Sequence, residues 1–367
     1  MIWVCLMKTL RSMTSVANTG RLLPWATLVV VLLAGAACQN QGVGRLQLEL
    51  SGEAQGTYYR ILYYDDQGRN FRPEVEQILH EVDMSASVHV PNSVISRVNR
   101  NETDVVDEIF AENFRMAWKV SEATDGAFDC TIGQLIEAWG WGFSQRDQIT
   151  QELIDSLRHL TGYKRVRLEN NRLYKEDSLI TINFNAIAKG YTCDLIANMF
   201  LENGVENFLI DIGGELVAHG KKPGRSFWQR PSLWTVGVEL PDDRGDVMPD
   251  NLMERPVRAL LRLTDIGIAT SGNYRKFYLE DGVKYSHTID PTTGFPVKHS
   301  MLSATVLAES AAVADAWATA FMVLGPERSK EMLKELDGIE AYFIYSDEEG
   351  NDKTWFSPGM ADIVQEL

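Results

Sequence analysis

Residues 46–68, LQLELSGEAQGTYYRILYYDDQG, set the first part of the fold. They contain two β-rich runs, LQLEL and GTYYRILYY, and the D-D-Q-G turn that ends the second run. Alternating, β-rich runs broken by turn residues are typical of paired strands. The stretch therefore predicts an antiparallel pair of strands.

Helical patterns follow this pair. Apolar residues recur at helical spacing within residues 74–84, and 105–123 predict a second helix. Farther along the chain we expect further elements, which are strands at 179–183, 207–212, 258–270, 283–289 and 301–308 and helices at about 186–203 and 311–324. Because strands and helices alternate irregularly, the order favours an α+β fold over a doubly wound parallel sheet. We expect mixed, largely antiparallel sheets with packed helices.

The bulk composition fits a folded, acidic protein. The chain has 367 residues, 45% of them hydrophobic, which is enough for a sizeable core. Its formal net charge is -16. Since phosphate-backbone binding needs a basic patch, this balance argues against a nucleic-acid partner.

The N-terminal segment resembles an export signal. Residues 1–37 contain three basic residues, no acidic residue and the apolar run ATLVVVLLAGAA directly before Cys38. We interpret 1–37 as a signal peptide, 38–50 as a lipidated cysteine and linker, and 51–367 as the folded domain. Gly35 stands where such sites usually have Leu, so simple cleavage and an uncleaved anchor stay open as alternatives to lipid attachment at Cys38. Cys130 and Cys193 predict two buried thiols, with a bridge as the alternative.

Two segments suit phosphate and metal chemistry. Lys189 lies in the first turn of the predicted helix in NFNAIAKGYTCD, where a helix N-terminus and an ammonium together favour an anion. Asp315 and Thr319 are four residues apart on a helix of alanines and large apolar residues, so they share a face. They could ligate a hard cation such as Mg2+. The alternatives are an ordinary helix-start lysine and a carboxylate paired within the protein.

Two weaker signals remain. In LIDIGGELVAHG, two glycines let the backbone pass close to another group, although a tight hairpin needs the same glycines. His287, in YSHTIDPTTGFP, can serve as a general base at neutral pH, or as a structural partner of Asp290.

In this order, the segments GEAQGTYYRI, SVISRVN, GAFDCTIGQLIEAWGWG, NAIAKGYTCD, DIGGEL, ATSGNYR, YSHTIDPTTGFPV and ADAWATAFMVLG resemble the FAD:protein FMN transferases, the ApbE family of exported lipoproteins. The resemblance implies a Mg2+-dependent transfer of the FMN half of FAD to a threonine hydroxyl of a target protein, with release of AMP. It also implies an FAD cleft between two subregions. Alternatives are an FAD pyrophosphatase and a non-catalytic FAD-binding lipoprotein.

The resemblance also assigns residues. It implies that the metal ligands are the Ala186 carbonyl, Asp315 and Thr319, and that His287 is the base for the acceptor threonine. Its FAD contacts fall on a larger set, which is Gln55, Ser87, Val88, His89, Asp129, Lys189 and Ile289. The family often has Met at position 55 and an aromatic residue at position 89, which puts details of the flavin and adenine contacts in question.

The resemblance finally implies a place and partners. We expect a protein that is lipid-anchored in the cell envelope and faces the periplasm, at the inner membrane rather than the outer. Its acceptors would be proteins such as subunits of membrane redox complexes.

Overall fold

The computed structural model describes residues 46–141, 149–224, 229–241, 256–273, 277–280, 283–286 and 288–367. Leu46–Leu367 form one compact unit. The predicted linker, residues 38–50, overlaps this unit because the first strand begins at Leu46. No helix among the described residues is both long enough and apolar enough to cross a bilayer.

The helices and strands follow one another in an irregular order, as predicted. The order is β1 (Leu46–Ala54), β2 (Thr57–Asp65), α3 (Arg72–Ala86), α4 (Val94–Asn99), α5 (Glu108–Ala123), α6 (Gly133–Ala138), α7 (Gln151–Arg158), β3 (Val166–Glu169), β4 (Arg172–Lys175), α8 (Ala188–Glu202), β5 (Phe208–Ile212), β6 (Glu215–His219), β7 (Trp234–Glu239), β8 (Val257–Leu263), β9 (Ile266–Gly272), β10 (Phe277–Glu280), β11 (Val283–Ser286), β12 (Met301–Ala308), α9 (Ala311–Leu333), β13 (Glu340–Ser346), β14 (Asp352–Phe356) and β15 (Val364–Glu366).

The main sheet has eight strands in the order β1-β2-β5-β6-β9-β12-β13-β14. Each neighbouring pair in it is antiparallel. The predicted β1–β2 pair is confirmed, with Leu50 opposite Ile61. Its turn passes through Gln55 and Gly56, both at positive φ, which glycine adopts at little cost and most other residues rarely adopt. The α+β expectation is therefore confirmed.

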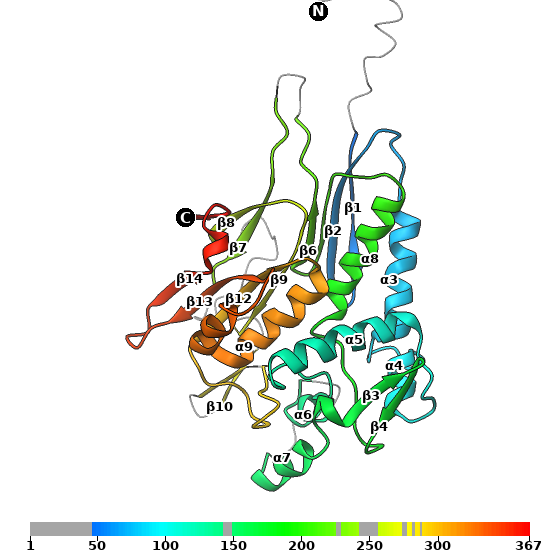
Figure 1. Cartoon of the computed structure of the whole chain (residues 1–367), viewed down its shortest axis with the longest axis vertical. Helices are drawn as coiled ribbons and strands as arrows, with labels where there is room; N and C mark the ends of the chain where they lie inside the picture. The colour runs from blue at the N-terminus through cyan, green and yellow to red at the C-terminus, as the bar shows by residue number, and fades with distance from the viewer. Residues whose placement is uncertain are drawn as a thin grey trace, which may run out of the picture. The chain divides into compact units, whose positions relative to one another are not determined.

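The sheet is covered on both faces, and β13 shows this clearly. Ala341 and Phe343 lie in the core under the helices, whereas Tyr342 and Ile344 lie in a second core with residues of β7 and β8. Successive side chains of a strand point to opposite faces, so this alternation places helices on one side and a smaller sheet on the other. Figure 1 shows α9 along β9 and β12, and α3 and α8 beside the β1–β2 hairpin.

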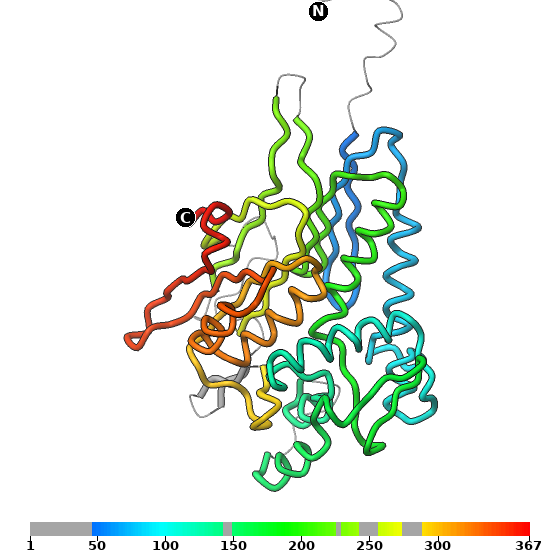
Figure 2. Tube along the Cα trace, viewed as in Figure 1, coloured from blue at the N-terminus to red at the C-terminus, as the bar shows by residue number. Residues whose placement is uncertain are grey.

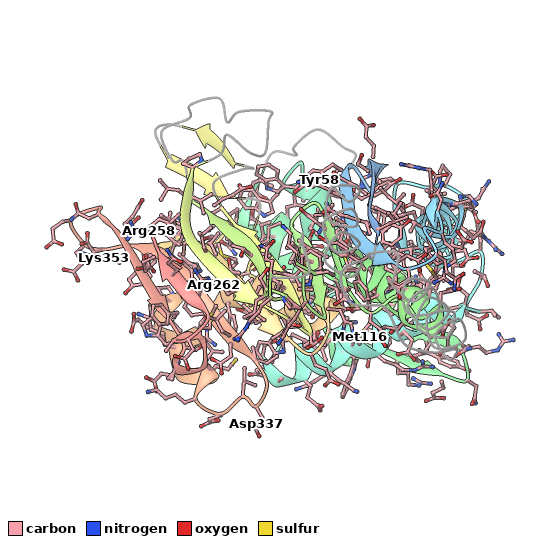
Figure 3. All side chains as sticks on the ribbon, turned by 90° about the horizontal axis from the view of Figure 1, so that it is seen from above. Tyr58, Met116, Arg258, Arg262, Asp337 and Lys353 are labelled. Atoms are coloured by element: carbon pink, nitrogen blue, oxygen red, sulfur yellow. The ribbon has the colours of Figure 1, made fainter. Side chains whose placement is uncertain are left out.

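The smaller sheet has the order β15-β8-β7 and is also antiparallel. Arg258 and Arg262, both labelled in Figure 3, come from β8. Arg258 pairs with Glu366 at 3.5 Å, and Arg262 donates to Gln365 at 3.1 Å. These contacts tie the C-terminal strand to the sheet.

The α8 helix is held against the hairpin by aromatic packing. Phe200 stacks on Tyr63 of β2 with ring centroids 5.0 Å apart, and Phe71 meets Phe200 edge-on at 5.6 Å. The tube in Figure 2 shows the same helix passing beside the hairpin. This packing holds the C-terminal end of α8, opposite to the end that carries Lys189, against the sheet.

The helix predicted at 311–324 is confirmed. Ser310 caps its N-terminus by accepting from Val313 N, and a break at Gly325, with φ 78°, separates it from a continuation that starts at Pro326. A positive φ cannot continue a right-handed helix, so the first segment ends at Leu324.

The strand predicted at 179–183 is wrong. Only Thr181 makes a bridge, to Ile132. The Asn99 side chain bonds both the N–H and the carbonyl of Ile182, and Asn183 N donates to the Cys130 carbonyl. This segment is extended because single groups hold its backbone, with no neighbouring strand to pair with.

Candidate active site

The start of α8 is fixed by a close approach to α9. A Cβ on Gly190 would lie 2.2 Å from the Ala311 carbonyl oxygen, so only glycine fits without displacing backbone. Asp194, one turn farther along α8, accepts from Ala311 N and Ala312 N at 2.8 and 2.9 Å. One helix thus caps the other, which sets Lys189 beside the first turns of α9.

Burial raises the pKa of Asp194 to about 6, although its hydrogen bonds from Ala311 and Ala312 oppose this shift. The carboxylate is therefore close to its titration range in mildly acidic solution. It serves as a cap, and the helix it caps carries Asp315.

Lys189, Glu215 and Asp315 form a buried charge cluster. Lys189 Nζ lies 2.8 Å from Glu215 Oε1 and 3.8 Å from Asp315 Oδ2. The two carboxylate side chains are 7% and 4% exposed, whereas that of Lys189 is 26% exposed. The ammonium is therefore the part of this cluster that solvent, or a ligand, can reach.

The pKa values in this cluster reflect burial and mutual attraction. Burial raises the pKa of Glu215 to about 7, with the Lys189 ammonium opposing the shift. Burial also raises the pKa of Asp315, again against Lys189. Burial lowers the pKa of Lys189, but the charges of Asp315 and Glu215 outweigh it, and the net pKa is raised. Lys189 is thus an ammonium at neutral pH.

The predicted metal ligands contain a carboxylate and a hydroxyl on one helix face. Asp315 accepts from Gly190 N at a long 3.4 Å, and Thr319 Oγ1 lies 3.2 Å from Ser271 Oγ of β9. Ala186, the third predicted ligand, lies in the half-buried turn just before α8. The structure places Asp315 against the start of α8, and its role as a metal ligand stays a prediction.

This donor set fits a hard cation. Asp315 is buried and receives one long hydrogen bond, from Gly190 N at 3.4 Å. Burying a carboxylate without strong partners costs free energy, and carboxylate oxygens are ligands that Mg2+ prefers. The described part of the chain has no cluster of three or more His, Cys, Asp or Glu suited to a metal, so the set depends on one carboxylate with neutral oxygens.

Gln55 joins the site from the hairpin turn. Its Nε2 donates to Thr192 Oγ1 at 2.8 Å, and its Oε1 is buried without a partner among the described residues. Thr192 lies three residues after Lys189, so the two share a face of α8. The hairpin and the helix therefore meet where the resemblance placed an FAD contact.

Asp129 is bonded within the protein. Its Oδ1 accepts from Thr131 N at 2.8 Å and Thr131 Oγ1 at 2.6 Å, and its Oδ2 accepts from Tyr163 N at 2.8 Å. Burial raises its pKa, and these hydrogen bonds oppose the shift. The contacts are those of a structural carboxylate, and its contact with FAD stays a prediction.

Ile289 and Ser87–His89 lie in two other parts of the unit. Ile289 is buried with Leu135, Trp139 and Ile154. Ser87, Val88 and His89 connect α3 to α4. The Ser87 carbonyl accepts from Ser93 Oγ, and the Val88 carbonyl accepts from Ser96 Oγ. His89 is exposed. Their roles toward FAD stay predictions, as does the predicted FAD cleft. His287 and Cys38 lie outside the described residues.

Glu215 was missed by the sequence prediction, which had only the weak DIGGEL signal for it. Gly213 and Gly214, both at positive φ, make the turn that places Glu215 at the start of β6. Cys193 Sγ donates to the Glu215 carbonyl at 3.2 Å, and Cys130 and Cys193 are both free, buried thiols as predicted.

The comparisons with known proteins identify the family. Residues 55–343 match the ApbE family. The chain belongs to the ApbE family. A protein of Vibrio cholerae named FAD:protein FMN transferase is 32% identical over 339 residues, covering 89% of this chain and 95% of the relative. The Escherichia coli K12 protein of the same name is 32% identical over 327 residues, with coverages of 86% and 88%.

Solved structures of the ApbE family share the fold. The flavin transferase ApbE from Vibrio cholerae superposes with a TM-score of 0.75 at 31% identity, covering 87% of this chain and 99% of that one. This ApbE-family chain is therefore an enzyme of the transferase class.

Proposed function

We propose that this chain is a FAD:protein FMN transferase that uses Mg2+, transfers FMN to a threonine hydroxyl of a target protein and releases AMP. One observation supports this most strongly, namely that the fold brings Lys189 within 3.8 Å of Asp315. A cation site beside a lysine at a helix start suits a pyrophosphate. The names of the relatives supply the reaction class.

Lys189 binds and orients the substrate in this proposal. Its ammonium pairs with a phosphate oxygen of FAD at the start of α8, where no side chain caps the helix. The Ala186 carbonyl, Asp315 and Thr319 would hold Mg2+. The ion, when bound, would neutralise charge on the pyrophosphate and polarise its phosphoryl oxygens. Phosphoryl transfer depends mainly on such charge stabilisation and positioning.

The proposed transfer makes one phosphorus–oxygen bond and breaks another. The threonine oxygen of the acceptor attacks the phosphorus of the FMN half of FAD, the pyrophosphate linkage to the other phosphorus breaks, and AMP leaves with the bridging oxygen. The threonine proton passes to a base. We propose His287 for this role from its sequence motif, because a neutral imidazole can take a proton at pH 7.

The test is to incubate the protein with FAD, Mg2+ and an acceptor domain, and to follow AMP and the acceptor mass. AMP together with acceptor heavier by one FMN supports the proposal. AMP with free FMN and unmodified acceptor would identify a pyrophosphatase, and neither product would identify a binding protein. His287→Asn should keep FAD binding and lose transfer, and full transfer by this variant would refute its role as base.

The site of action is also a proposal. We propose that residues 1–37 direct export, that Cys38 carries a lipid and that the enzyme faces the periplasm, at the inner membrane, where subunits of membrane redox complexes would be its acceptors. The basic and apolar N-terminal segment supports this. Labelled fatty acid should be incorporated by the unmodified chain and not by Cys38→Ser, and equal labelling would refute lipid attachment.

A further inference from the structure

Among the described residues, the side chain of Glu215 hydrogen-bonds to Lys189. Its Oε1 accepts from Lys189 Nζ at 2.8 Å, while its Oε2 is buried without a hydrogen-bond partner among the described residues. The two-glycine turn before it fixes its backbone at the first residue of β6. The side chain therefore reaches the lysine from β6, whereas Asp315 reaches it from α9.

The lysine lies between two carboxylates at unequal distances. Asp315 Oδ2 is 3.8 Å from Nζ, beyond hydrogen-bond reach, whereas Glu215 is in direct contact. Asp315 is otherwise bonded only weakly, by Gly190 N at 3.4 Å. A flexible lysine in a buried, weakly screened site moves to the strongest available partner. Removing the Glu215 contact would thus leave Asp315 as the next partner of the ammonium.

We propose that Glu215 is a positioning residue that holds the Lys189 ammonium away from Asp315, so that the Asp315 carboxylate stays available to a divalent cation. The inference rests on the proposed function, because it takes Asp315 as a metal ligand. Without Glu215, the Lys189 ammonium would compete with the cation for the Asp315 carboxylate, because the ammonium would occupy the position of the cation. Glu215 itself touches neither the cation nor the substrate in this account.

Two substitutions separate position from charge. Glu215→Asp keeps the charge but withdraws the carboxylate by one carbon–carbon bond, which lengthens the contact to about 4.3 Å, farther than Asp315. Glu215→Gln keeps the length and a neutral acceptor, but removes the charge. If only local charge matters, Glu215→Asp should bind a cation as the unmodified chain does.

The experiment is calorimetric titration of the full chain with MgCl2 alone. We expect Glu215→Asp to weaken Mg2+ binding by about tenfold or more, the usual effect of losing a residue that orients a ligand. Adding Lys189→Met to Glu215→Asp should restore binding, because the competing ammonium is gone. A purely structural role for Glu215 would not be rescued by this second change. Circular dichroism checks that each variant is folded.

Asp211→Asn is the matched control. Asp211 lies on the same hairpin and accepts from Gly214 N at 3.0 Å and Tyr58 Oη at 3.3 Å, without contacting Lys189. Its loss should leave the Mg2+ affinity unchanged. Unweakened binding by Glu215→Asp, or no recovery in the double variant, would overturn the inference while the transferase assay of the unmodified chain still stands. Absence of Mg2+ binding by the unmodified chain would overturn both.

Discussion

Asp129 and Asp315 are both buried aspartates, with 7% and 3% of the whole residue exposed, but their hydrogen-bond partners differ. Asp129 receives three hydrogen bonds of 2.6 to 2.8 Å from Thr131 and Tyr163. Asp315 receives one bond of 3.4 Å from Gly190 and has an ammonium at 3.8 Å. The first carboxylate is fully bonded within the protein, and the second has weaker partners among the described residues.

This difference is the one that we expect between a carboxylate that holds the fold and one that binds a cation. Burying an ion is favourable only when fixed donors or an opposite charge replace the lost water. At Asp129 the backbone N–H and hydroxyl of Thr131 and the backbone N–H of Tyr163 supply those donors. At Asp315 the compensation is incomplete, so a bound cation would complete it, and the following predictions test this contrast.

The largest expected effect is on catalysis by Asp315→Asn. We expect FMN transfer to fall by about a thousandfold, because a cation at the phosphoryl oxygens contributes several kcal/mol to the transition state. The measurement is the rate of AMP release at saturating FAD. Since the carboxylate is poorly satisfied, the Mg2+-free variant should unfold at the same temperature as the parent or higher. Retained activity would show that Asp315 does not hold the cation.

Asp129→Asn should affect stability instead. The amide N–H2 would face donors that now bond a carboxylate, so we expect a loss of about 3 kcal/mol in the free energy of unfolding. Urea denaturation followed by circular dichroism measures this, with Asp315→Asn as the comparison variant. An unchanged midpoint for Asp129→Asn would mean that its hydrogen bonds are not structural.

Gly190→Ala tests the close contact that places the lysine. The added methyl group would meet the Ala311 carbonyl, and overpacking of this kind costs about 1–3 kcal/mol. We expect a lower thermal midpoint together with weaker Mg2+ binding, since α8 and α9 must separate. A variant as stable as the parent would show that the two helices can shift without cost.

The last prediction concerns pH and Asp194. Its pKa in the folded protein, about 6, lies above its ordinary value, so the folded state holds a proton that the unfolded state has lost. The contribution of this group to stability therefore falls as pH rises from about 4 to 6, by up to about 1.4 kcal/mol per pH unit, and is constant above that window. Asp194→Asn should remove this part of the slope in urea midpoints measured across the range. An unchanged slope would contradict the assignment.

Much of this could be predicted from local pattern. The β1–β2 pair and the helix at 311–324 follow from residue alternation and helical spacing, and both are confirmed. Asp315 stood out because a carboxylate on an alanine-rich helix face needs a partner. In each case the residues that form the pattern lie within a few positions of one another, so their spacing in the sequence determines which face of the element they share.

The rest depends on contacts between distant segments. Glu215 meets Lys189 only because β6 lies beneath α8, and nothing near DIGGEL indicates that pairing. Asp129 was assigned an FAD contact through the resemblance, and nothing in the sequence indicated the hydrogen bond that Tyr163 N, far along the chain, donates to it. Residues 179–183 have strand-like composition, but their backbone groups bond Asn99 and Cys130 instead of a strand. Such outcomes are decided by tertiary structure rather than by local propensity.

The most direct test of a cation site at Asp315 is thermal unfolding of the parent, Asp129→Asn and Asp315→Asn, each with and without MgCl2. A cation that binds only the folded state raises the midpoint in proportion to its occupancy. The account predicts a Mg2+-dependent rise in the parent and in Asp129→Asn, and none in Asp315→Asn. An equal rise in Asp315→Asn would contradict it, because the cation would then bind somewhere other than the carboxylate that the fold leaves open.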